Sequence, residues 1–160
     1  MGFLERLEQT AYAQWILTSA VGWPLMLSLH ALGLAIIVGV VFSLNLRMYG
    51  FFRVLPYTSL RGLMGIGWIG IILNIFTGVS VFLTRPVGYM ASNPFRVKIL
   101  CIVLGIVVLV YTRKMLAREA ASWDASGAAP PIATWLATAS LFFWIVAVVS
   151  GRLIAYIDYS

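Results

Sequence analysis

The stretch WPLMLSLHALGLAII, residues 23–37, decides the fold of this 160-residue chain. It lies inside a run from about residue 15 to residue 46 that carries no Lys, Arg, Asp or Glu. A helix needs roughly 20 mainly apolar residues to cross the hydrocarbon core of a bilayer. The run therefore predicts a membrane-spanning helix, and it places the only histidine of the chain, His30, inside that helix.

Composition extends this prediction to the whole chain. Hydrophobic residues make up 62% of the sequence and charged residues 10%, far from the balance of soluble globular domains. Helices satisfy their own backbone hydrogen bonds in lipid, so each long apolar run is read as a helix. The expected spans are residues 15–46, 60–84, 97–116 and 132–157. We predict an all-α integral membrane protein, in which residues 1–160 form one domain with four transmembrane helices in an up-down bundle.

The first 14 residues have a different pattern. Phe3, Leu4 and Leu7 fall near one side of a helical wheel, and charged or polar residues occupy the rest. This pattern predicts a short N-terminal helix that lies along the membrane interface. Acidic residues in this segment, and the length of the apolar run after it, argue against a cleaved signal peptide.

An even number of spans places both termini on one side of the membrane, which we name side A; the opposite side is side B. Loops and ends then carry Arg6, Arg85, Arg96 and Lys98 on side A, and Arg47, Arg53, Arg61, Arg113, Lys114 and Arg118 on side B. Arg152 is expected within the end of the fourth span. The positive-inside rule therefore favours a cytoplasmic side B and periplasmic termini. The scattered basic residues indicate topology and attraction to a lipid bilayer, not binding of nucleic acid.

Polar groups within the spans are the candidate functional residues, because they are costly to bury in lipid. His30 could ligate a haem iron, relay protons, or form a hydrogen bond between helices. Asn74 could bind a ligand or hold two helices together. Arg152, joined by Arg96 and Lys98 from the start of the third span, could hold a carboxylate, a phosphate or a haem propionate, or could reach lipid phosphates.

Small residues predict where helices approach one another. The faces expected to pack are Ala31, Ala35 and Gly39 in the first span, Gly70, Asn74, Thr77 and Gly78 in the second, Cys101, Gly105 and Thr112 in the third, and Thr134 and Thr138 in the fourth.

Several kinds of chemistry have no visible residues to perform them. The chain has one His and one Cys, and the cores of its spans contain no acidic residue, which argues against a zinc or two-metal site built by one chain. We find no Ser, His and Asp set, no phosphate-binding glycine loop and no paired carboxylates. Hydrolase and nucleotide-dependent activities are therefore not expected.

At the level of motifs, the chain resembles a family of small bacterial four-helix inner-membrane proteins grouped as a domain of unknown function. The resemblance is carried by WPLMLSLHALGLAIIVG from Trp23, LNLRMYG from Leu44, LNIFTG from Leu73, NPFRVK from Asn93 and GRLIAYI from Gly151. It implies the fold, a location in the bacterial inner membrane, and a special status for His30, Asn93, Arg96, Lys98 and Arg152.

Relatives in that family are expected to carry a second histidine near the position of Thr112. If haem is bound here, the second axial position then falls to another group, such as Met64 or Tyr111, to a partner protein, or to nothing.

Three functions follow as hypotheses. The first is a cytochrome b-like protein that binds haem b through His30 and transfers electrons between quinone and a partner. The second is a structural or accessory protein that forms a homo-oligomer or docks against other membrane subunits. The third is a transporter of an ion or small molecule along a path past His30 and Asn74.

Overall fold

The computed structural model describes residues 2–157. Within this range the chain is helical, with no strand. The elements are α1 (Phe3–Glu8), α2 (Ala11–Thr18), α3 (Gly22–Met48), the 3-10 helix η1 (Tyr57–Ser59), α4 (Leu60–Phe82), α5 (Pro86–Ala91), α6 (Asn93–Ser126) and α7 (Pro131–Ile157).

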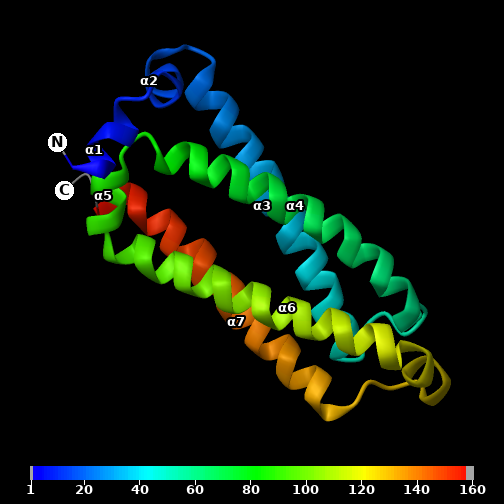
Figure 1. Cartoon of the computed structure of the whole chain (residues 1–160). Coiled ribbons are helices and arrows are strands. Elements are labelled where there is room, and N and C mark those ends of the chain that lie inside the picture. Colours follow the sequence, from blue (N-terminus) through cyan, green and yellow to red (C-terminus); the bar gives the residue numbers. More distant parts are fainter. Residues whose placement is uncertain (1, 158–160) are drawn as a thin grey trace.

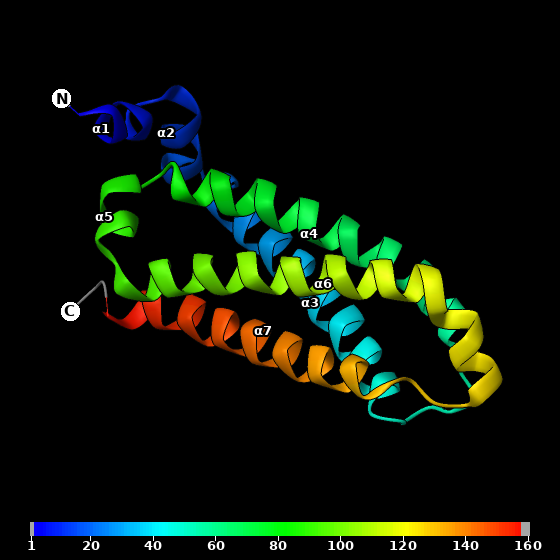
Figure 2. The same cartoon turned by 60° about the horizontal axis from the view of Figure 1, so that its bottom comes forward.

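The four long helices form two antiparallel hairpins, α3 with α4 and α6 with α7 (Figures 1 and 2). The hairpins meet mainly through α3 and α7, whereas α4 and α6 contact each other only sparsely. The chain runs up and down along the bundle, so α1 and the end of α7 lie at the same end, side A (Figure 1).

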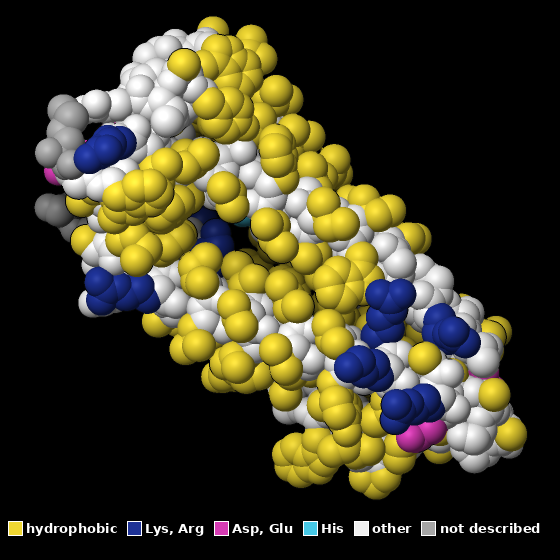
Figure 3. Space-filling view, viewed as in Figure 1, with side chains coloured by type: hydrophobic (Ala, Val, Ile, Leu, Met, Phe, Trp, Pro, Cys, Tyr) yellow, Lys and Arg dark blue, Asp and Glu magenta, His cyan; other side chains and the backbone are white. Residues whose placement is uncertain are grey.

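Each long helix can cross a bilayer. The shortest, α4, has 23 residues and is about 35 Å long at a rise of 1.5 Å per residue, more than the roughly 30 Å of hydrocarbon. All four are apolar enough to span, and hydrophobic side chains cover most of the visible surface between two ends that carry Lys and Arg (Figure 3). The predicted all-α membrane protein with four transmembrane helices is confirmed.

The N-terminal region differs from the prediction, because two short helices replace one and the first long helix begins at Gly22 instead of near residue 15. Thr10 caps α2 by accepting the N–H of Ala13 at 3.3 Å. The Ser19 hydroxyl accepts the N–H of Gly22 at 2.6 Å in the turn before α3. A Cβ at Gly22 would lie 2.7 to 2.9 Å from atoms of this turn, so the close approach requires glycine. Local hydrogen bonding thus interrupts an apolar run that hydropathy alone reads as continuous.

Helix α6 also differs, since it continues ten residues past the expected end at Leu116, to Ser126. Ala120 and Trp123 are buried in this extension, and Gly127 ends it with a left-handed backbone at φ +75°. At the other end Ser92 caps the helix by accepting the N–H of Phe95 at 3.3 Å.

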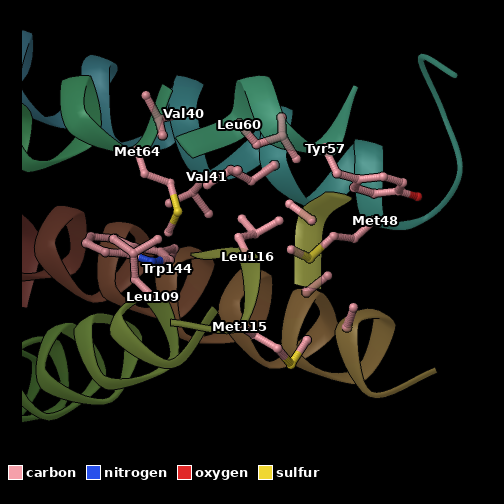
Figure 4. Packing of buried hydrophobic residues seen from close by; sticks show 14 of the residues in the cluster. Val40, Val41, Met48, Tyr57, Leu60, Met64, Leu109, Met115, Leu116 and Trp144 are labelled. Carbon is pink, nitrogen blue, oxygen red and sulfur yellow. The ribbon is translucent and has the colours of Figure 1, made fainter. Parts of the chain in front are cut away.

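The buried hydrophobic cluster lies in the side-B half of the bundle. Met64 of α4, Leu116 of α6 and Leu44 of α3 are almost fully buried there, and Trp144 of α7 borders the same cluster (Figure 4). The two hairpins are therefore fastened together at side B.

Polar contacts strengthen this end. Buried Arg47 donates to the Leu55 carbonyl at 2.6 Å and to the Tyr57 hydroxyl at 2.9 Å. The Asp124 carboxylate accepts the backbone N–H groups of Tyr57 at 2.5 Å and Thr58 at 3.1 Å. The loop between α3 and α4 is thereby tied to the extension of α6.

We expect Arg47→Gln to destabilise the protein, because the buried Tyr57 hydroxyl and the Leu55 carbonyl lose a charged donor. The free energy of unfolding in detergent should fall by about 2 kcal/mol, the order expected for hydrogen bonds to a charged group. The matched control is Arg53→Gln, since Arg53 is an exposed residue of the same loop. Equal effects of the two substitutions would contradict a specific role for Arg47.

Candidate functional site

A cavity of about 530 Å³ separates the two hairpins and is lined by residues from the side-A half of the bundle. Figure 3 shows a hollow between α4 and α6 with a basic side chain inside it. The lining comes from one face of α3, from Asn74 of α4, from the segment around α5, and from α6 and α7. Its position follows from the packing, because the buried hydrophobic cluster joins the hairpins at side B. At the side-A end α4 and α6 meet through the stacked rings of Phe82 and Phe95, 5.6 Å apart, and the cavity lies between these two contacts.

His30 lines this cavity and is oriented by α4. Its Nδ1 lies 2.9 Å from the Thr77 hydroxyl oxygen. When that hydroxyl gives its one hydrogen to the Leu73 carbonyl at 2.8 Å, the neutral imidazole donates to it from Nδ1. Among the described residues none hydrogen-bonds to Nε2. The ring therefore presents an unshared electron pair on Nε2, the form in which histidine binds metals or accepts a proton.

The backbone around His30 is held just as firmly. Asn74 Nδ2 donates to the His30 carbonyl at 2.8 Å, which joins α4 to α3. A Cβ at Gly33 would lie 3.2 Å from the Asn74 nitrogen and from the Gly70 carbonyl oxygen, so the two helices touch backbone to backbone. A Cβ at Gly78 would lie 3.4 Å from His30 Cε1, which fixes one edge of the ring against α4.

The charged residues that line the cavity in the described part of the chain are basic. Lys98, Arg152 and Arg85 line it, and its lining contains no Asp or Glu. Lys98 lies over Gly151 of α7, where a Cβ would come within 3.3 Å of Lys98 Cδ and 3.4 Å of its Nζ. The Arg152 guanidinium lies 5.6 Å from the centre of the Tyr156 ring. Among residues 2–157, the cavity therefore offers cations to an anionic group and places no carboxylate beside them.

The remaining walls are apolar and aromatic, with Trp23, Leu27, Ile102, Trp144 and Val148 among them. The volume lies within the roughly 300 to 1,000 Å³ typical of small-molecule sites. The cavity thus fits an amphipathic ligand with an anionic end and a flat or apolar body.

Four of the five predicted site residues come together in this cavity: His30, Asn74, Lys98 and Arg152. Arg96 does not. It is exposed, and its Nε donates to the Met90 carbonyl at 2.9 Å. The reason is helical phase, because two residues along a helix correspond to a rotation of about 200°, so Arg96 and Lys98 point to opposite sides of α6.

The residues considered as a second axial ligand of haem lie outside the cavity. Met64 is buried in the side-B cluster, Tyr111 is 55% exposed on the outside of α6, and Thr112 is buried without lining the cavity.

Sequence reasoning missed Arg85, Tyr89, Trp23 and Trp144 as lining residues. The sequence places Arg85 on side A together with Arg152, and this shared side was the one indication that Arg85 could belong to the site. The aromatic residues look like ordinary interfacial residues until the gap between the hairpins is known.

We predict that the neutral His30 ring carries its hydrogen on Nδ1. Since the chain has one histidine, nitrogen NMR of histidine-labelled protein should show a single Nδ1–H ring. Thr77→Val should convert this signal to the Nε2–H form or to a mixture, because the acceptor for Nδ1–H is lost. A wild-type ring with its hydrogen on Nε2 would contradict the assignment.

Comparison of the chain with family models, with curated proteins and with solved structures finds no match in any of the three.

Proposed function

We propose that this multi-pass membrane protein binds haem b in the cavity between its hairpins, with His30 as the iron ligand. The observation that supports this most directly is that Nε2 of His30 has no hydrogen-bond partner among the described residues, in a mainly apolar cavity that Lys98 and Arg152 also line. Neutral imidazole is a common ligand of haem iron, and haem b carries two carboxylates that need positive partners.

The depths of the residues agree with this proposal. His30 is eight residues from the start of α3 and Lys98 five from the start of α6, or about 12 Å and about 7 Å along the helices. Arg152 lies near the C-terminal end of α7, also at side A. The cations therefore lie closer to the side-A surface than the imidazole does, which suits a group that is anionic at one edge.

The protein's own residues have separate roles in the proposal. Thr77 holds Nδ1–H and so keeps Nε2 free, as partners of the second nitrogen do in many metal sites. Lys98 and Arg152 neutralise the carboxylates, and Trp23 and Trp144 supply apolar walls. Haem would supply one-electron redox chemistry, which fits electron transfer between quinone and a partner.

Location and family belong to the same proposal. The motifs that resemble the small bacterial inner-membrane family, together with the distribution of basic residues, support the bacterial inner membrane with both termini in the periplasm.

Spectroscopy tests the haem proposal. Protein expressed with haem precursor and purified in detergent should show a Soret band near one haem per chain, which shifts on reduction with dithionite. His30→Ala should remove the band, and Arg152→Gln should weaken haem retention, because one carboxylate loses its partner. Arg96→Gln is the matched control, since Arg96 lies outside the cavity. A folded but colourless wild-type protein would refute the proposal.

A second candidate is the accessory or self-associating membrane protein, and one observation favours it. The predicted packing face of α3 is only partly used within the chain: Ala31 lines the cavity, but Ala35 is exposed, and a Cβ at Gly39 would meet no atom within 4 Å. Small residues that face lipid allow another helix to approach closely. No comparable observation favours transport.

We expect Gly39→Leu to reduce any association, because its side chain would block close helix approach. Energy transfer between labelled copies in vesicles measures self-association, and co-purification in mild detergent measures other subunits. Gly65→Leu is the control, as Gly65 of α4 is also exposed with open space around it. Association that is unaffected by Gly39→Leu would exclude this face.

A further inference from the structure

A second hollow lies at the opposite end of the bundle, on side B. It has a volume of about 320 Å³ and lies between the end of the apolar part of α6 and the beginning of α7. Tyr111, Lys114 and Arg118 line it from α6, and Ile132 lines it from α7. We propose that this side-B groove binds the phosphate headgroup of an anionic phospholipid.

The charges of the groove are the first argument. Lys114 and Arg118 are four residues apart, so they share one face of α6. Both are exposed, and within residues 2–157 neither forms an ion pair, although Glu119 also borders the groove. Two unpaired cations and one carboxylate leave the groove positive.

The depth of the groove is the second argument. No charged residue occurs between Lys98 and Arg113, so the hydrocarbon region ends on α6 close to Tyr111. Arg113 lies 6.0 Å from the centre of the Trp68 ring, and Trp135, one turn after Ile132, is 73% exposed. Tryptophan and tyrosine prefer the level of the lipid headgroups. The cations of the groove therefore lie at the depth of lipid phosphates.

The walls provide the third argument. Ile132, half of whose surface is exposed, gives the groove an apolar side that continues into the lipid-facing surface of α7, and buried Met115 lies at its base. Basic pockets between transmembrane helices are known to bind anionic headgroups, and each Lys or Arg near the surface contributes about 1 kcal/mol. A phospholipid matches both the cations and the apolar wall of this groove, because its phosphate lies at the headgroup level and its acyl chains extend into the hydrocarbon. A free phosphate would contact only the cations.

Native mass spectrometry of the detergent-purified full chain tests the proposal. The protein is titrated with phosphatidylglycerol or with phosphatidylcholine of the same acyl chains, and the bound fraction is measured. Phosphatidylglycerol should bind roughly 10-fold more tightly or better, given about 1 kcal/mol for each of two basic residues. The double variant Lys114→Gln with Arg118→Gln should lose this preference.

Arg113→Gln is the matched control, because Arg113 is adjacent in sequence but does not line the groove. This variant should keep the preference for phosphatidylglycerol over phosphatidylcholine. If it lost the preference as fully as the double variant does, general surface charge and not the groove would explain the binding. Equal binding of the two lipids by the wild type would overturn the proposal. So would displacement of phosphatidylglycerol by glycerol phosphate at the lipid's own concentration, since the site would then be an anion site alone. If the double variant fails to fold, the wild-type lipid comparison and the glycerol phosphate competition decide.

Discussion

The concentration of the buried hydrophobic packing at one end of the two hairpins is the constraint on which the rest of the structure depends. Leu44, Met64 and Leu116 close the side-B half, and Asp124 ties the loop before α4 to the extension of α6. Two hairpins that are fastened at side B diverge toward side A, where no such cluster fills the space. The cavity is therefore a consequence of where the apolar packing lies, and its walls are set by the faces that the hairpins turn toward each other.

Within the first hairpin, packing and site geometry depend on the same few residues. Gly33, Gly70 and Gly78 let α3 and α4 approach until Asn74 and Thr77 reach the backbone and ring of His30. In lipid, such polar side chains are stabilised only when they find partners. The contacts that satisfy Asn74 and Thr77 also fix the imidazole, so orientation of the ring needs no additional element. Because Thr77 contacts Nδ1, Nε2 is the ring nitrogen that is left to face the cavity.

Hydropathy was sufficient to predict the four spans, the class of fold and the convergence of His30, Asn74, Lys98 and Arg152, because depth in a membrane can be estimated from position in a run. Three features depend on contacts that a single run does not encode. The break before Gly22 comes from a side-chain cap. The extension of α6 comes from the burial of Trp123. Helix α3 packs against α4 through Gly33 and not through Gly39, because of the direction from which α4 approaches. Arg96 was placed wrongly because the helical phase of α6 relative to α7 was unknown.

The two ends of the bundle treat positive charge in opposite ways, and this difference has a thermodynamic consequence. In the side-B core, buried Arg47 is satisfied by oxygens of the chain itself, so this buried charge needs no ligand. On side A, Lys98 and Arg152 line a cavity to which residues 2–157 contribute no carboxylate. A ligand that binds only the folded state stabilises it by RT ln(1 + [L]/Kd). An anionic ligand of the cavity would therefore also stabilise the side-A half, where the hairpins have little apolar packing of their own, so occupancy of the site and stability of that half of the fold are linked.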